Sequence, residues 1–253
     1  MRSCEKGARE VYLRSGVREG YENGLRIHQS IAQQIGSEIL RGNLQPGAAL
    51  DGEVEQAGTL GVSRTAYREA IRTLVAKGLL ESRPKAGTRV TPRENWNLLD
   101  PDVLKWMLLG EPNLDFIGSL FELRQMIEPR AAAFAAERRC DGDIAKMREA
   151  LKMMREYGLD SKEGRSADRN FHACVLRATG NDALASLASS IGAAVLWTTR
   201  FKFGRSARPR DSLPDHEAVF GAILKRRPQK ARKLMSQLVE RAAEDAGIGL
   251  PTD

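Results

Sequence analysis

The chain has 253 residues, of which 42% are hydrophobic and 29% are charged. This length and composition are typical of a folded protein with one large domain or two modest ones, and they exclude a chain that is disordered throughout. The net charge is +7, and residues 1–93 alone carry 15 basic and 10 acidic side chains. Such a positive field suits a polyanion such as DNA, although a difference this small also serves solubility.

The lengths of the apolar runs and the spacing of the cysteines indicate the cellular compartment of the protein. The longest apolar runs, such as 131–136 and 191–197, fall far short of the about 20 residues that cross a bilayer, and the N-terminus lacks the apolar core of a signal peptide. Cys4, Cys140 and Cys174 are odd in number and have neither CxxC nor CxxxC spacing, so no disulfide framework or cysteine zinc site is indicated. We therefore expect a cytoplasmic protein with reduced thiols and no membrane association.

The first ordered segment is predicted to begin at residue 25, because residues 1–24 are charged, lack an apolar period and suggest a flexible leader. Isoleucines then recur at helical spacing and predict a first helix that ends near Gly42. These are Ile27, Ile31, Ile35 and Ile39. Turn residues follow, and a short second helix is predicted over about 53–60, closed by Gly61 as a left-handed cap.

A third helix is predicted after Ser63, which is a good N-cap residue. Its buried face is expected to consist of residues at i, i+3, i+4 and i+7, namely Tyr67, Ala70, Ile71 and Leu74. The opposite, exposed face then carries Arg64, Arg68 and Arg72, four residues apart, with Thr65 beside them. A charged stripe is usually only a solvated face, but an arginine can also bind guanine edges or phosphates.

Two β-prone runs follow Gly78 and are joined by Pro-Lys-Ala-Gly, which predicts a hairpin with basic tips. The order helix, helix, turn, helix and hairpin indicates a winged helix-turn-helix over 25–92, and the basic hairpin favours DNA binding over a merely solvated arginine row. The residues expected to face double-stranded DNA are Ser63, Arg64, Thr65, Arg68, Arg72, Lys85, Gly87 and Arg89. Which arginines contact bases and which contact phosphates stays open.

The rest of the chain shows no further β pattern, so the predicted fold is mainly α: the winged helix-turn-helix with its small β-hairpin wing, then an all-α bundle. We expect a linker with a connecting helix over 93–113, an all-α domain over 114–247 for effector binding and dimerisation, and a tail over 248–253. The helices of that domain are predicted at 114–139, 141–158, 161–179, 182–203, 214–225 and 228–245.

A metal site is suggested by Asp168 and His172, which are four residues apart and therefore share a helical face. Both side chains can bind a divalent cation, and His216 could complete a two-histidine, one-carboxylate triad. The alternative is an Asp–His pair that only stabilises its helix, with an exposed His216.

Three further side chains are candidates for effector binding together with the triad. Arg124 can hold a carboxylate through two parallel hydrogen bonds, or it can form a salt bridge with Glu122 or Glu128. Trp197 and Arg200 lie on a predicted helix that could close the pocket, although Trp197 can equally pack in the core.

The N-terminal segment resembles the DNA-binding domain of GntR-type bacterial regulators, on the motifs GVSR, REAIRTL and KGLL in that order. One departure concerns affinity. Where that family usually has LPSERELA this chain has LDGEVEQA, so an arginine that commonly contacts phosphate is replaced by Val54.

Residues 114–245 resemble the FCD ligand-binding domain of the FadR subfamily, on ELRQMIEPRAAAFAAERR, DxxFH and HEAVFGAI. The resemblance implies one divalent metal ion of the Zn, Ni or Mn class, held by Asp168, His172 and His216. A further histidine of that domain is Leu238 here, so the resemblance implies either a metal with three protein ligands and open positions for water or an effector, or a site that binds effector without metal. The connector around Trp96 is similar to that of the galactonate repressors in the family, which suggests a sugar-acid effector.

We therefore expect a homodimeric transcriptional regulator, a repressor of a sugar-acid catabolic operon, which leaves or rearranges on its operator when a small carboxylate such as an aldonate binds. Two alternatives are a metal-dependent enzyme that uses the Asp/His/His triad and a purely structural helical dimerisation module. Against the enzyme, the chain has no Gly-rich phosphate loop and no nucleophile elbow.

Overall fold

The computed structural model describes residues 26–83, 87–107, 113–205 and 210–250. The chain divides into two compact units, residues 1–110 and 111–253. The expected leader over 1–24, Cys4 and Lys85 lie outside the described residues. None of the described helices is both long and apolar enough to cross a membrane.

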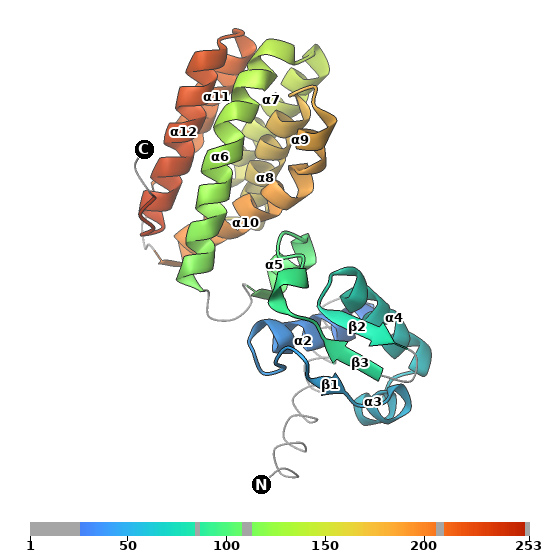
Figure 1. The fold of residues 1–253 in the computed structure, drawn as a ribbon. Coiled ribbons are helices and arrows are strands. Elements are labelled where there is room, and N and C mark those ends of the chain that lie inside the picture. Colours follow the sequence, from blue (N-terminus) through green and yellow to red (C-terminus); the bar gives the residue numbers. More distant parts are fainter. Residues whose placement is uncertain (1–25, 84–86, 108–112, 206–209, 251–253) are drawn as a thin grey trace. The chain divides into compact units, whose positions relative to one another are not determined.

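The first unit is a winged helix-turn-helix (Figure 1). Its helices are α2 (Ile27–Leu40), α3 (Glu53–Leu60), α4 (Arg64–Ala76) and α5 (Pro101–Met107), with a short 3-10 turn at Arg93–Asn95. Its strands are β1 (Ala49–Leu50), β2 (Leu80–Arg83) and β3 (Gly87–Val90), which form an antiparallel sheet in the order β1, β3, β2. The predicted hairpin is β2 and β3, with Leu80 opposite Val90, while β1 arises in a segment expected to be only a turn.

The core of the first unit contains the apolar residues that the helical spacing predicted to be buried. Ile31, Ile35 and Ile39 of α2 are buried against Tyr67, Ala70, Ile71 and Leu74 of α4. The two caps form as expected, because Gly61 ends α3 with φ +66° and the Ser63 Oγ accepts a hydrogen bond from the Ala66 amide at 3.1 Å. These caps fix the turn between α3 and α4 and hence the direction in which α4 presents its arginines.

The connecting segment after β3 packs into the first unit as far as α5. Trp106 lies so close to α2 that a Cβ on Gly36 would sit 2.5 Å from its ring. The Lys77 Nζ, at the end of α4, donates to Asp100 at 2.7 Å and to Asp102 at 2.8 Å. The start of the predicted linker is therefore fixed to α2 by packing and to the end of α4 by charge.

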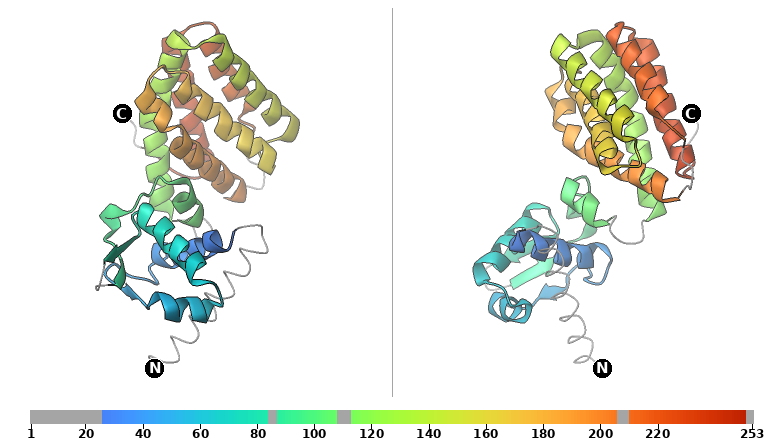
Figure 2. Two further views of the ribbon diagram at one scale, coloured as in Figure 1. Left: turned by 90° about the vertical axis from the view of Figure 1, so that its right-hand side faces the viewer. Right: turned by 180° about the vertical axis from the view of Figure 1, so that it is seen from behind.

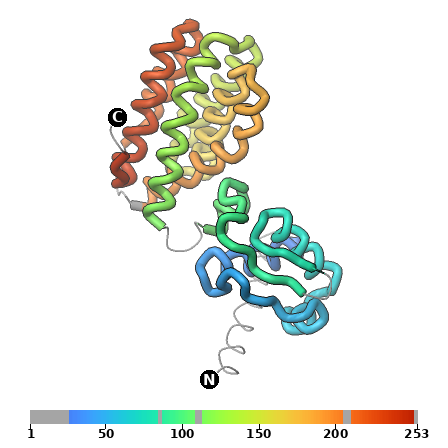
Figure 3. Tube along the Cα trace, viewed as in Figure 1, coloured from blue at the N-terminus to red at the C-terminus, as the bar shows by residue number. Residues whose placement is uncertain are grey.

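In its described part the second unit consists of helices (Figures 1 and 2). They are α6 (Leu114–Arg138), α7 (Asp141–Tyr157), α8 (Lys162–Arg177), α9 (Asp182–Ser186), α10 (Ala188–Arg205), α11 (Leu213–Leu224) and α12 (Pro228–Asp245). The long helices α6 and α12 run side by side, as the green and red traces of Figure 3 show, and α8 packs against both α7 and α10. Helix α8 is thereby central to the bundle.

One expected helix of this unit is in fact two. The sequence predicted a continuous helix over 182–203, but α9 ends at Ser186 and α10 begins at Ala188. The amide of Leu187 donates to the carbonyl of Leu184, three residues back, so the last turn of α9 tightens and the helix axis is interrupted.

Candidate functional sites

The exposed row on α4 forms as predicted. The side chains of Arg64, Arg68 and Arg72 are 63%, 52% and 68% exposed, on the face opposite the buried stripe. Thr65 and Ser63 are also exposed, although the Ser63 Oγ is occupied by the helix cap. An exposed helix with such donors fits the DNA major groove.

Each arginine of the row has a carboxylate partner that sequence reasoning did not name. Glu53, the first residue of α3, accepts from the Arg68 Nη2 at 2.8 Å and Nε at 3.2 Å, and from the Arg64 Nε at 3.4 Å. Arg72 instead pairs with Glu69 of its own helix at 2.6 Å. The turn between α3 and α4 separates Glu53 from the arginine row along the chain, so only the folded structure brings them together.

The wing contributes a smaller part of the same surface. Gly87 is exposed and has φ +79°, which favours glycine at the start of β3. The Arg89 side chain is exposed, and its Nη1 donates to the Gly47 carbonyl at 3.1 Å, a contact that ties β3 to the turn before β1.

The proposed metal ligands come together inside the second unit. Asp168 and His172 of α8 and His216 of α11 are each at most 3% exposed, and one ligand atom from each lies within 4.8 Å of the others. The His216 Nε2 is 3.0 Å and the His172 Nε2 is 3.4 Å from the Asp168 Oδ1, and the two Nε2 atoms are 3.3 Å apart. His216 is therefore buried, and the alternative of an exposed His216 is wrong.

Three neighbouring groups hold these side chains in place. The His172 Nδ1 donates to Glu128 of α6, and the His216 Nδ1 donates to the Ser212 carbonyl at 2.7 Å. The Thr199 hydroxyl of α10 donates to the Asp168 Oδ2 at 2.8 Å. Such partners orient metal-binding side chains and fix the histidine tautomer.

The site is charged although it is buried. Burial opposes ionisation of Asp168, but hydrogen bonds from His172 and His216 hold its pKa well below its usual range. Burial likewise disfavours an imidazolium at His172, yet the charge of Glu128 and the hydrogen bond to Asp168 raise its pKa. The surroundings thus favour a carboxylate at Asp168 and a positive charge beside it.

The donor set fits a metal ion. Because the Nδ1 atoms of both histidines donate to Glu128 and to the Ser212 carbonyl, each ring, when it is neutral, directs an Nε2 lone pair inward, toward the carboxylate oxygen of Asp168. Three electron-pair donors facing one another in a buried site require a cation between them, either a proton or a divalent metal. Nitrogen and oxygen ligands of this kind suit Zn²⁺ and similar ions.

Arg124 is buried next to this site and takes the ion-pair arrangement. Its Nε donates to the Glu128 Oε1 at 2.7 Å, and its Nη1 donates to the Thr198 hydroxyl at 2.7 Å. Burial raises the pKa of Glu128, but the charges of His172 and Arg124 outweigh burial and lower it. Glu128 therefore links Arg124 to the candidate metal ligand His172.

The other two predicted effector residues, Trp197 and Arg200, lie on α10, whereas the position of the missing histidine, Leu238, lies on α12. Trp197 is buried, and the guanidinium of Arg200, which is exposed, lies over its ring at 5.0 Å. On the same helix it is Thr199 that reaches the triad. Leu238 is 2% exposed and, as a leucine, offers no ligand atom.

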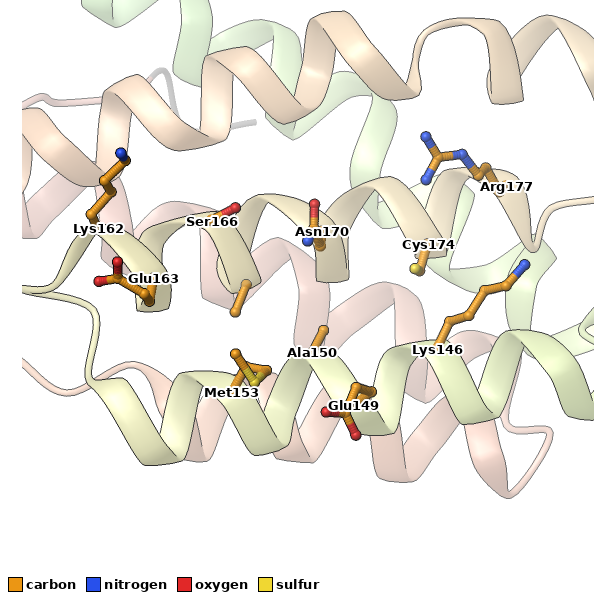
Figure 4. A pocket seen from close by; sticks show the side chains of 11 residues that line it. Lys146, Glu149, Ala150, Met153, Lys162, Glu163, Ser166, Asn170, Cys174 and Arg177 are labelled. Atoms are coloured by element: carbon orange, nitrogen blue, oxygen red, sulfur yellow. The ribbon is translucent and has the colours of Figure 1, made fainter.

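An open groove of about 670 Å³ also lies between α7 and α8 (Figure 4). Lys162 lies toward one end and Lys146 and Arg177 toward the other, while Glu149 and Glu163 offset part of this charge. No member of the triad lines this groove, and its charges alternate rather than converge on one point.

Comparison with known proteins places both units in one family. The profile of "Bacterial regulatory proteins, gntR family" matches residues 27–90, and that of the FCD domain matches residues 119–241. The galactonate operon transcriptional repressor of Escherichia coli is 35% identical over 192 residues, which cover 75% of this chain and 83% of that protein. The chain belongs to the GntR family.

Further relatives agree with this assignment. The Uxu operon transcriptional regulator of Escherichia coli is 30% identical and covers 85% of this chain and 84% of its own length. LutR of Bacillus subtilis is 30% identical over 73% of this chain and 85% of its own length. The solved structure of Lar, which controls the expression of the Listeria monocytogenes agr system, shares the fold with a TM-score of 0.64 at 19% identity, covering 88% of this chain and 97% of that one.

Membership of the GntR family makes this protein a DNA-binding transcriptional regulator with an FCD effector domain, and it leaves the metalloenzyme alternative without support. The predicted fold, family and regulatory function are thus confirmed. Sequence reasoning missed Glu53, Ser212 and Thr199, and it considered Glu128 only as a partner of Arg124. Of these, only Glu128 had a sequence signal, because it follows Arg124 by four residues.

Proposed function

We propose that this GntR protein is a homodimeric repressor of a sugar-acid catabolic operon and that a small hydroxycarboxylate bound at the triad lowers its affinity for the operator. The convergence of Asp168, His172 and His216 inside the FCD domain carries the proposal. The relatives support the choice of effector, because one is named for the galactonate operon and another for an L-lactate dehydrogenase operon. Operator binding implies a cytoplasmic protein.

One divalent ion of the Zn, Ni or Mn class would be held by the two histidine Nε2 atoms and the Asp168 carboxylate. Bound there, it supplies positive charge and open coordination positions for carboxylate and hydroxyl oxygens. Glu128 and the Ser212 carbonyl keep the Nε2 atoms turned inward, and Thr199 orients the carboxylate. Leu238 adds no fourth ligand, so an effector oxygen can complete the coordination.

The effector-binding residues that we propose besides the triad are Arg124, Trp197 and Arg200. An effector carboxylate would share Arg124 with Glu128, which already accepts from its Nε. Trp197 and Arg200 form a stacked pair on α10, where Thr198 contacts Arg124 and Thr199 contacts Asp168. This helix is thus the element on which effector binding acts.

The DNA contacts that we propose are those predicted on α4 and the wing: Ser63, Arg64, Thr65, Arg68, Arg72, Lys85, Gly87 and Arg89. A dimer would place two such surfaces on a two-fold symmetric operator. Effector and DNA must then weaken each other's binding by the same factor, a coupling of about 1–3 kcal/mol in typical allosteric proteins.

Fluorescence anisotropy with duplexes from the protein's own promoter region tests this function. We expect specific binding by the metal-loaded protein, a rise in the dissociation constant when galactonate or lactate is added, and a dimer by light scattering. Elemental analysis should find about one metal ion per chain in the wild type and none in His172→Ala. A protein that binds no such duplex, or whose binding ignores every hydroxycarboxylate offered, would contradict the proposal.

A further inference from the structure

The carboxylate of Glu53 lies beside two arginines of the row that we propose faces DNA. Glu53 accepts from both Arg64 and Arg68, although these residues are part of a different helix, and its side chain is 30% exposed. The hydrogen bond from Arg68 lowers the pKa of Glu53 below its usual range, so the group is charged at neutral pH. An acid at this place repels DNA phosphates and therefore calls for a reason.

The geometry of the pair with Arg68 supplies that reason. Arg68 uses its side edge, Nε and Nη2, to hold the two carboxylate oxygens of Glu53. The end edge of the guanidinium, Nη1 with the outer N–H of Nη2, lies outside this pair and has the two parallel donors that match guanine O6 and N7. The carboxylate thus fixes the plane of the guanidinium without using the edge that reads a base.

The pair between Arg72 and Glu69 has the opposite geometry. There the carboxylate accepts from Nη1, which belongs to the end edge, and both residues lie on α4 three positions apart. This second ion pair has the same charges and similar exposure, and it therefore provides an internal comparison for the first.

Phosphate and base differ in how they tolerate the carboxylate. A phosphate that approaches Arg64 or Arg68 must come close to a second negative charge, whereas a neutral base edge adds no charge and can bind beside it. Glu53 also forms part of the wall of a hollow of about 550 Å³ between α3, α4 and the strands, together with Arg68, Arg72 and the hydroxyl-bearing Ser82 and Thr88. A DNA strand that enters this hollow meets Glu53.

We propose that Glu53 is a specificity-determining residue of the regulator: it withholds Arg64 and Arg68 from phosphates and presents Arg68 to a base edge. The inference rests on the operator binding proposed above. If Glu53 acts in this way, the surface binds non-specific DNA more weakly than three free arginines would. The operator sequence still receives the hydrogen bonds from Arg68 to its base edge.

The test is Glu53→Gln, with Glu69→Gln as the matched control. Binding is measured by anisotropy on the promoter duplex and on a scrambled duplex of equal length, over a series of salt concentrations. Because each variant removes one negative charge near DNA, both should bind the scrambled duplex more tightly and steepen the salt dependence by about 1 in log–log slope. Only Glu53→Gln should lower the ratio of specific to non-specific affinity, by about fivefold or more, the scale of one lost bidentate base contact.

The double variant Glu53→Gln with Arg68→Ala distinguishes two effects of Glu53, the positioning of the Arg68 guanidinium and the presence of a negative charge near DNA. Once Arg68 is absent, Glu53→Gln should change the specificity ratio less than it does when Arg68 is present, because only Arg64 is then released; an undiminished change would contradict the role of Arg68. If Glu53→Gln and Glu69→Gln change both duplexes by the same factor, the inference is wrong while operator binding stands. If the wild type shows no preference for any promoter duplex, operator binding itself fails, and the inference fails with it.

Discussion

Glu128 is the residue whose replacement tests the buried site most directly. Glu128→Gln keeps the shape of the side chain but removes its charge, and the new amide group cannot accept from both the Arg124 Nε and the His172 Nδ1. The side chains of Arg124 and Glu128 are 3% and 0% exposed, so they form a buried ion pair. Breaking such a pair typically lowers the free energy of unfolding by about 3–5 kcal/mol. For a chain of this size that corresponds to a drop in Tm of roughly 6–20 °C.

The same change should weaken metal binding, because Glu128 fixes the orientation and tautomer of His172. Loss of such a partner typically lowers metal affinity by about 10–100-fold. Chemical denaturation of the metal-free protein measures the first effect, and competition with a chelator measures the second. Glu122→Gln is the control, since Glu122 is exposed on the same helix and its replacement should stay within about 0.5 kcal/mol. A Glu128→Gln protein that matches this control in stability and in metal affinity would refute the reasoning.

Three further changes test the remaining parts of the structure. If Arg64 contacts a base, Arg64→Ala should cost about 1–3 kcal/mol of binding free energy for the operator alone. An equal loss on all duplexes, with a shallower salt dependence, would indicate that Arg64 contacts a phosphate. Unchanged dissociation constants by anisotropy would show that Arg64 is not part of the interface. His172→Ala should abolish the metal in elemental analysis and the effector response while operator binding remains, and a retained response would contradict the metal centre. Gly78→Ala should destabilise the first unit by at least about 1–3 kcal/mol, because Gly78 has φ +75° and a Cβ would lie 2.0 Å from the Asn95 carbonyl oxygen; an unshifted denaturation midpoint would show that this contact relaxes freely.

Most of the DNA-binding unit could be predicted because its signals are local. Capping by Ser63, the left-handed Gly61 and the apolar period of α4 each involve residues within a few positions of one another. Strand β1 had no such signal, since two residues suffice for it and its partner Arg89 lies far along the chain. The break at Leu187 was missed because the helical period of the sequence continues through it.

The candidate metal centre was predictable only in part. Two ligands lie four residues apart on α8, a spacing that is visible in any helical segment, and His216 was suggested because few histidines were available. That His216 is buried and directs its Nε2 at Asp168 follows from the packing of α11 in the bundle. The support from Glu128 depends likewise on the neighbouring helix α6.

The amino-acid sequence by itself determined the order and type of the elements, the exposed arginine row and the family, because periodicity, caps and motifs are encoded over short distances. Tertiary structure alone decided which distant charges meet: Glu53 with Arg64 and Arg68, and Glu128 with His172. The physical reason is that an ion pair depends on separation and burial in space, and helix packing sets both for residues that are far apart along the chain.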